Sequence, residues 1–380
     1  MPENLPDTIA SVRTEMTNFI ATHITPNAMD SAAIDTDARE LRKNIQDASK
    51  KAGFFYKTQP KEFGGNPAST LELTMLREML AATNSELASA VFGPGPGVLH
   101  SAEGSLKTRY LEPVLRGEKR GAFGFTEPDS ATRPTYAVID ADDLLISGQK
   151  SYITGGATAD FVSILVNVEQ ADGTKMGTAM VAVDREASGV VIDREFSSME
   201  GSGHVSMTFD QVRVPQAHVI GNIGEGMPRA LGNIGNVRLL LSAQAIGMCQ
   251  WVLEFVESYL KRPHRTGTPL ADKEGVRLRF ADMRIETYIA RSALYRTARL
   301  VDSGENSVNE TIATKVFCTE TAGRVVDWGV QLVGGQALVQ GHPLEKLYRE
   351  VRSLRLTEGA SDLLRLNLAK GKLELGKGRI

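Results

Sequence analysis

The fold of this chain is decided by the stretch Leu144–Val166, which reads LLISGQKSYITGGATADFVSILV. Its two ends, Leu144–Ile146 and Phe161–Val166, are short apolar runs of strand length, and glycine-rich polar sequence separates them. Four more runs of this kind surround the stretch: Ala137–Ile139, Met180–Val183, Val190–Ile192 and Val205–Phe209. Turn signals stand between the runs. The pattern predicts an all-β module of short strands, a small barrel or sandwich, over residues 119–224.

The segments on both sides of this module show helical spacing instead. Ile9, Val12 and Met16 recur at the helical period within residues 1–118, and wide apolar stripes run through residues 225–380. We therefore predict an N-terminal helical domain, the middle β domain and a C-terminal four-helix bundle. Strands confined to the middle of the chain argue against βαβ winding, so Gly224-Glu225-Gly226 indicates a turn before a helix rather than a dinucleotide fingerprint.

Composition limits the class of protein. The chain has 380 residues, of which 42% are hydrophobic and 23% charged, with a net charge of −3. These values are ordinary for a soluble globular protein and give no basic field for nucleic acid. No apolar run is judged to approach transmembrane length, and the N-terminus does not resemble a signal peptide, so we expect a cytoplasmic protein without a membrane partner. The two cysteines are expected to be reduced core thiols, and no Cys/His spacing suggests a metal site.

One carboxylate near the C-terminus is a candidate general base. Glu358-Gly359-Ala360 follows Tyr348-Arg349-Glu350 and lies between two apolar helical stretches. A carboxylate held there loses solvation, which raises its pKa above the usual Glu value of about 4.3. Such a base can remove a weakly acidic C–H proton near neutral pH.

Six segments, taken in order, resemble motifs of the acyl-CoA dehydrogenase family. They are Pro60–Gly65, Phe125–Pro128, Gly148–Gly156, Val212–Pro215, Gln331–Gly335 and Pro343–Glu350, the last leading into Glu358. The likeness covers nearly the whole chain. It implies an α+β multidomain fold and an FAD-dependent oxidoreductase that acts on an acyl thioester.

The resemblance also assigns residues to the flavin. Thr126 and Thr154, with adjoining backbone N–H groups, would bond the polar edge of the ring, with Thr154 near N5. Phe125 would also contact the flavin, and Tyr152 and Ile153 would cover its face and exclude water. The segment with Gln331, Gly334 and Gly335 would meet the adenosine–pyrophosphate arm across a subunit interface. On the residues alone, the threonines fit ordinary strand or turn positions, and the two glycines fit a helix C-cap.

The chain departs from the family pattern mainly at the phosphate and adenine ends. The loop after Pro128 lacks the usual glycines, and Thr132 would supply the hydroxyl that a serine offers in the family. Arg262 or Arg265 would serve the pyrophosphate, and the sequence does not choose between them. Ala360 stands where threonine is common, and Asp362 stands where glutamine often contacts adenine.

The reaction implied by the resemblance oxidises an acyl-CoA to a trans-2-enoyl-CoA. The thioester would enter between Glu358 and the flavin, Glu358 would remove the α-proton, and the backbone N–H of Glu358 would bond the thioester carbonyl. Gly359 and Arg238 would lie near the substrate, although Arg238 also fits a solvated helix charge. An electron-transfer flavoprotein or similar acceptor would reoxidise FAD, and the protein would be a homotetramer or homodimer.

The sequence leaves three alternative functions open. The acyl group could be bound to a carrier protein in a biosynthetic reaction, met by the basic cluster Lys107, Arg109, Arg116, Lys119 and Arg120, which also fits a solvated surface. The chain could instead be a flavin-dependent monooxygenase on the same fold. A non-catalytic member of the family is the third alternative, because the phosphate and adenine contacts are altered.

Overall fold

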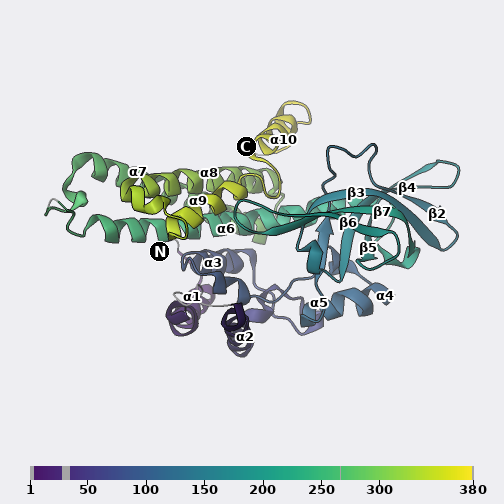
Figure 1. Ribbon diagram of the computed structural model, residues 1–380, viewed down its shortest axis with the longest axis horizontal. Helices are drawn as coiled ribbons and strands as arrows, with labels where there is room; N and C mark the ends of the chain where they lie inside the picture. The colour runs from purple at the N-terminus through teal and green to yellow at the C-terminus, as the bar shows by residue number, and fades with distance from the viewer. Residues whose placement is uncertain (1–3, 28–34, 266, 379–380) are drawn as a thin grey trace. The chain divides into compact units, whose positions relative to one another are not determined.

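A computed structural model describes residues 4–27, 35–265 and 267–378 of the chain. By packing, the chain divides into two compact units, each described here by itself. One comprises Thr58–Pro67 and Gly93–Ile234, and the other comprises Met1–Lys57, Ala68–Phe92 and Gly235–Ile380. Helical segments stand on both sides of a β-sheet segment along the chain, as Figure 1 shows, so the predicted α+β multidomain fold is confirmed. The three predicted domain boundaries stay predictions.

The first unit is built on one eight-stranded sheet with the order β6-β7-β3-β2-β4-β5-β8, and β1 pairs with β4. Its strands are β1 (Gly121–Gly124), β2 (Tyr136–Asp140), β3 (Asp143–Thr154), β4 (Phe161–Glu169), β5 (Lys175–Asp184), β6 (Val190–Ser197), β7 (Gly203–Pro215) and β8 (Val219–Ile220). All six predicted runs fall within these strands. The sequence missed β1 and β8 because four and two residues are too short to show an alternating pattern.

The longest apolar run, Phe161–Val166, lies in β4, and side chains on both faces of this strand are buried. Val162, Ile164 and Val166 point into the core of the sheet module. Phe161 and Leu165 pack on the other face, against the helical segment that contains α4 (Gly104–Leu106), η8 (Lys107–Leu111) and α5 (Glu112–Arg116). A strand buried on both sides reads as a continuous hydrophobic run rather than as an alternation.

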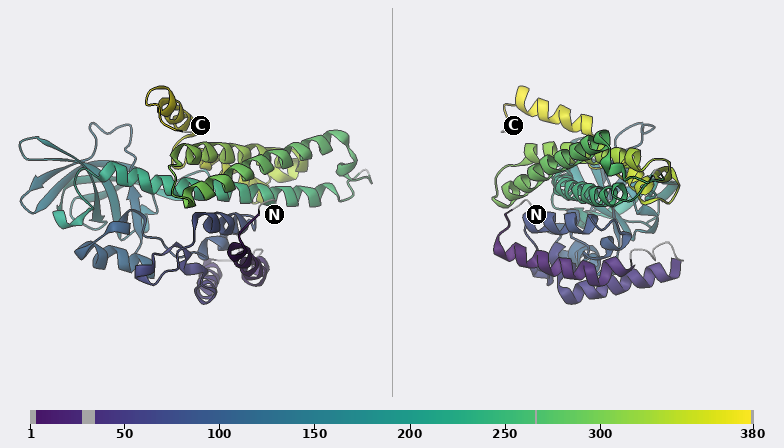
Figure 2. Two further views of the ribbon diagram at one scale, coloured as in Figure 1. Left: turned by 180° about the vertical axis from the view of Figure 1, so that it is seen from behind. Right: turned by 90° about the vertical axis from the view of Figure 1, so that its left-hand side faces the viewer.

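The second unit is helical. It contains α1 (Asp7–Phe19), α2 (Asp35–Ala52), α3 (Thr70–Ala81), most of α6 (Gly226–Leu260), α7 (Glu274–Asp302), α8 (Val308–Val333), α9 (Pro343–Leu354) and α10 (Ser361–Leu373). Helices α6 to α9 run side by side, whereas α10 projects from this bundle (Figures 1 and 2). Leu364 holds α10 against α8 through Ile312 and Val316. Helix α6 begins at Gly226, so the predicted turn before a helix is confirmed.

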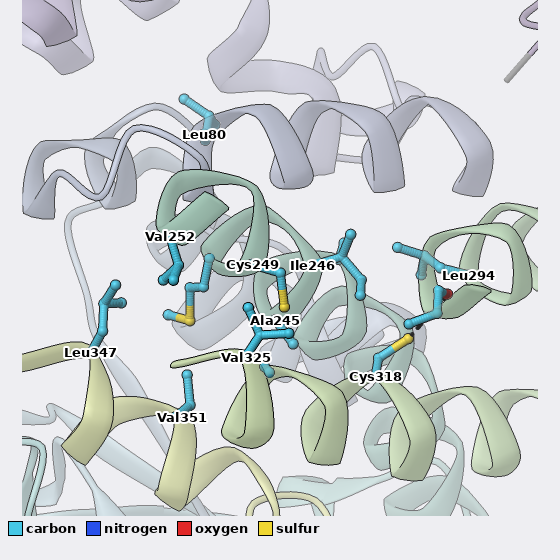
Figure 3. Packing of buried hydrophobic residues seen from close by; sticks show 14 of the residues in the cluster. Leu80, Ala245, Ile246, Cys249, Val252, Leu294, Cys318, Val325, Leu347 and Val351 are labelled. Atoms are coloured by element: carbon cyan, nitrogen blue, oxygen red, sulfur yellow. Dashed lines mark hydrogen bonds between the residues drawn. The ribbon is translucent and has the colours of Figure 1, made fainter. Parts of the chain in front are cut away.

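The core of the helical unit is drawn in Figure 3, where Cys249 and Cys318 lie among aliphatic side chains of several helices. Both thiols are buried and free, as predicted, and burial raises the pKa of Cys249 to about 12. Close packing also fixes a glycine: a Cβ on Gly247 of α6 would lie 2.3 Å from the Glu78 carbonyl oxygen of α3. The two helices can approach this closely only where no side chain separates them.

Helix α6 corrects one expectation. Among the described helices it is the one that is long and apolar enough, by length and composition, to cross a membrane, so the expectation that no apolar run approaches this length is wrong. Buried core helices pass the same test, and 56% of its most apolar window is buried inside the molecule. Its hydrophobicity is used in packing the bundle.

Candidate active site

The structure joins the two segments of the sheet unit that the resemblance assigns to the flavin, the loop after β1 and the end of β3. The Ser151 N–H donates to the Thr126 carbonyl at 2.8 Å. Lys150, which is almost fully buried, donates through Nζ to the Phe125 carbonyl at 3.2 Å and pairs with the Glu127 carboxylate at 2.8 Å. Burial lowers the pKa of Lys150, and Glu127 opposes that shift. A lysine inside the Gly148–Gly156 motif therefore holds the Phe125–Pro128 segment against β3.

Tyr152 presents an aromatic ring at the end of β3. Its side chain is 64% exposed, and its backbone is left-handed, with φ +55°. The ring packs edge-on against Phe196 at 5.4 Å between centroids and against His204 at 6.3 Å. A non-glycine residue in this conformation is uncommon and is found mainly at turns and functional sites. The geometry suits the predicted role of Tyr152 as a face for a flat ligand.

The Thr154 hydroxyl belongs to a hydrogen-bonded chain that the sequence did not reveal. Thr154 Oγ1 lies 3.1 Å from His204 Nδ1, and His204 Nε2 lies 3.1 Å from Ser202 Oγ. Ser202 Oγ in turn donates to the Glu200 carboxylate at 2.6 Å. Only the pairing of β3 with β7 brings His204 beside Thr154, so nothing in the local sequence marks that histidine.

The position of Ile153 contradicts one of the predicted flavin contacts. Its side chain is 0% exposed and packs inside the sheet core. The prediction that this side chain covers a flavin face is therefore wrong, because successive side chains of a strand point to opposite faces. Phe125 is half-buried and stacks on Phe123, whereas Thr126 and Thr132 are exposed on the loop between β1 and β2.

In the helical unit, the segment Gln331–Gly335, predicted to meet the adenosine arm, lies at the C-terminal end of α8. Gln331, Gly334 and Gly335 are exposed. Gly334 has φ 79° and ψ −155°, so it ends the helix as a glycine C-cap. The Tyr259 hydroxyl donates to the Val333 carbonyl at 3.1 Å and fixes this end of the helix against α6. The exposed glycines leave the backbone open to a ligand.

The remaining predicted contacts are scattered over the surface of the helical unit. Arg262 and Arg265 are exposed in the connection after α6, and the structure does not choose between them. Ala360 is the half-buried N-cap residue of α10. Asp362 is 98% exposed and lies 3.5 Å from Arg365. Arg365, which had no predicted role, pairs with Glu320 at 2.7 Å and so links α10 to α8.

Glu358 lies between α9 and α10 in an environment suited to a base. Its side chain is half-buried, and its backbone is left-handed, with φ +55°. Burial raises the pKa of Glu358, while Arg238 and Lys315 oppose that shift. Arg238 Nε of α6 donates to the Glu358 carbonyl at 3.0 Å, so Arg238 is not a solvated helix charge. In the part of the chain that the structure describes, the Glu358 N–H donates to no backbone carbonyl.

Lys315 is a second charged group at Glu358, and the sequence analysis did not select it. It lies on α8, is 0% exposed, and donates through Nζ to the Gly359 carbonyl at 2.8 Å. Burial, reinforced by Arg238, lowers the pKa of Lys315 to about 8. A signal was available in the sequence: Lys315 stands among the apolar stripes of residues 225–380, where a charged residue is rarely buried without a partner.

Comparison with known families agrees with this arrangement. The acyl-CoA dehydrogenase N-terminal, middle and C-terminal domains match residues 6–118, 122–212 and 224–373. The chain belongs to the acyl-CoA dehydrogenase family. Its enzyme class follows: it is an oxidoreductase that acts on CH–CH bonds, as predicted.

Three curated relatives illustrate the range of the family. A 3-(aryl)acrylate reductase of Clostridium sporogenes is 27% identical over 88% of this chain and 91% of its own length. A caffeyl-CoA reductase–Etf complex subunit of Acetobacterium woodii is 26% identical over 91% and 93%. A short-chain specific acyl-CoA dehydrogenase of Clostridium acetobutylicum is 28% identical over 95% and 97%.

A solved structure carries the cofactor. The acyl-CoA dehydrogenase of Bacillus anthracis complexed with FAD has a TM-score of 0.82 and 23% identity, covering 99% of this chain and 68% of its own. The prediction of FAD as the cofactor agrees with this family. The residues described above fit parts of a flavin. Within the sheet unit, Thr126, Tyr152 and Thr154 are exposed. Within the helical unit, taken by itself, Gly334 and Gly335 after α8 are exposed.

Proposed function

We propose that this protein is an FAD-dependent dehydrogenase of an acyl-CoA thioester, with Glu358 as the general base. The observation that carries the proposal is the environment of Glu358. Its carboxyl is half-buried with a raised pKa, and its backbone carbonyl is held by Arg238. A base with a raised pKa is better matched to a weak carbon acid than an ordinary surface carboxylate.

The protein residues have separate roles in this mechanism. Glu358 removes the α-proton, and its backbone N–H donates to the thioester carbonyl oxygen, where negative charge develops. Arg238 keeps the Glu358 carbonyl turned toward itself, which leaves the carboxyl to the substrate. When bound, FAD supplies the hydride acceptor. We assign its ring to Phe125, Thr126, Tyr152 and Thr154, with Thr132 as a further hydroxyl, and its adenosine–pyrophosphate arm to Gln331, Gly334 and Gly335.

The test of this function is an anaerobic titration of the purified flavoprotein with a panel of acyl-CoAs. We expect the visible absorption of the flavin to bleach with at least one acyl-CoA, because oxidation of the substrate reduces the flavin. Acyl groups on a carrier protein form a second arm. A flavoprotein that no thioester bleaches, or a colourless protein that FAD does not reconstitute, would contradict the proposal. Oxygen consumption coupled to substrate hydroxylation would select the monooxygenase alternative.

Reduction of an enoyl thioester is a second candidate, because two of the relatives are named as reductases. The same glutamate serves this direction, since a carboxyl with a raised pKa can also donate a proton. The protein reduced with dithionite would then be reoxidised by an aryl-substituted enoyl-CoA faster than the oxidised protein is bleached by the saturated thioester. The opposite order of rates would favour dehydrogenation.

The basic cluster proposed to meet a carrier protein gains no support from its contacts. Arg109 pairs with Asp184, and Arg116 pairs with Glu118 at 2.8 Å. Lys119 donates to the Arg109 carbonyl at 3.0 Å. Since three of the five cationic side chains are engaged by neighbouring groups of the same unit, we favour CoA over a carrier protein. An electron-transfer flavoprotein is the proposed acceptor, supported by the Etf complex of the Acetobacterium relative. Cytoplasmic localisation stays a prediction.

We also propose a homo-oligomer, a tetramer or a dimer. Exposed apolar side chains form one stripe along α7, at Leu278, Ile285 and Ile289, and another along α10, at Leu363, Leu366 and Leu373. Both stripes follow helical spacing, as at a subunit interface. Light scattering should give a multiple of the chain mass of 41.2 kDa, and Leu363→Glu with Leu366→Glu should reduce that mass. A monomeric wild-type protein would contradict this proposal.

A further inference from the structure

Two cationic side chains of the helical unit donate hydrogen bonds to consecutive backbone carbonyls at the proposed base. Arg238 Nε donates to the Glu358 carbonyl at 3.0 Å, and Lys315 Nζ donates to the Gly359 carbonyl at 2.8 Å. Because each peptide group is planar, a held carbonyl fixes the orientation of its whole peptide. The two held peptides flank the Gly359 Cα, so the two contacts together set the path of the chain directly after Glu358.

This path is an unusual one. Glu358 and Gly359 are both left-handed, with φ of +55° and +108°. A Cβ on Gly359 would lie 3.1 Å from Leu364 Cδ2, so the segment is also tightly packed against α10. A left-handed glutamate is strained and persists only where its surroundings impose it. The contacts from Arg238 and Lys315 are the described polar interactions that do so at these two peptides.

Burying the Lys315 ammonium group only to bond the Gly359 carbonyl would be energetically unfavourable. The residue is 0% exposed, and burial of an ammonium group is unfavourable unless partners compensate it. Four charged groups act on it: Arg238 of α6, Glu358 of the loop, Arg355 at the end of α9, and Glu320 of its own helix, which Arg365 of α10 neutralises. An apolar residue would pack there at lower cost, so the charge itself points to a use.

We propose that Lys315 is a positioning residue for the general base: its ammonium clamps the Gly359 peptide, which fixes the direction of the Glu358 carboxyl. The inference rests on the proposed function. It predicts that the length and the charge of Lys315 matter separately. The length holds the loop, and the charge sets the pH at which Glu358 becomes a base.

The experiment compares Lys315→Met, which keeps the stem but removes the charge, with Lys315→Arg, which keeps a charge. Lys370→Met, at an exposed position of α10, is the control. We expect Lys315→Met to lower kcat by about 10²-fold, with a much smaller change in KM, because a displaced base affects the chemical step. Lys315→Arg should recover part of that loss.

The pH profile separates this role from a purely structural one. The acid limb of the wild type, where Glu358 gains its proton, should lie above pH 4.5, because burial raises that pKa. In Lys315→Met the limb should move to still higher pH, since the cation that lowered the Glu358 pKa is gone. The wild type should also lose activity as pH rises through about 8, where Lys315 is neutralised, and Lys315→Arg should lack this alkaline limb.

Hydrogen–deuterium exchange tests the clamp without any turnover. Peptides that cover residues 355–361 should exchange faster in Lys315→Met than in the wild type or in Lys370→Met. If these peptides exchange faster in Lys315→Met but the wild-type protein oxidises no thioester, the clamp is supported and the proposed function fails. An unchanged acid limb together with unchanged exchange would overturn the inference, and so would a loss of melting temperature with no shift of that limb.

Discussion

Glu358→Gln is expected to retain FAD and to lose dehydrogenation by about 10²–10⁴-fold or more, which is the contribution of a positioned general base. Glutamine has nearly the same shape, and the contact from Arg238 goes to the backbone carbonyl of residue 358, so the loop should keep its conformation. An amide, however, does not accept a proton near neutral pH. Anaerobic stopped-flow reduction of the flavin by the best acyl-CoA of the panel measures the effect.

Glu374→Gln is the matched control for this variant. Glu374 follows α10 in the same unit and is exposed, so its loss should leave the rate of flavin reduction unchanged. The absorption spectrum before mixing reports whether the cofactor is retained. Near-normal reduction by Glu358→Gln, with the cofactor bound, would show that another group removes the proton.

Arg291→Met is expected to give the largest loss of stability. Arg291 Nε of α7 pairs with the Glu78 carboxylate of α3 at 2.6 Å, and both side chains are nearly inaccessible. The Gln250 amide of α6 also donates to this carboxylate. Burial raises the pKa of Glu78, and Arg291 is the main opposing charge. Removing the Arg291 cation leaves the buried Glu78 carboxylate without its opposing charge, which should lower the free energy of unfolding by about 3–5 kcal/mol. The midpoint of urea unfolding, followed by circular dichroism, measures the loss.

Arg324→Met supplies the comparison. Arg324 of α8 makes an ion pair with Glu286 at the similar distance of 2.7 Å, but its side chain is 42% exposed. Exposed pairs contribute only about 0–1 kcal/mol, so the midpoint should barely move. The double variant Glu78→Gln with Arg291→Met should recover part of the stability, because no unpaired charge remains. Equal losses for Arg291→Met and Arg324→Met would show that burial does not govern the cost.

The β module shows which structural features a local sequence pattern can predict. All six apolar runs became strands, because an alternating or doubly buried run carries its own signal. The role of the Ile153 side chain was predicted wrongly, although its neighbours Tyr152 and Thr154 are exposed. Motif resemblance assigns a whole segment to a ligand, whereas the pleat of a strand sends every second side chain inward.

By itself, the sequence determined the order of helical and sheet segments, the family and the candidate base, because these depend on periodicity and on motifs that are contiguous in the chain. Only the tertiary structure brought Lys315 to the loop of Glu358 and His204 to Thr154. Those pairs are 44 and 50 residues apart in the chain, counting Lys315 to Gly359 for the first. Such contacts arise from the packing of whole elements and from strand register, which no local pattern records. The same packing removes water from Glu358, and the resulting change in its pKa makes an ordinary glutamate a candidate base.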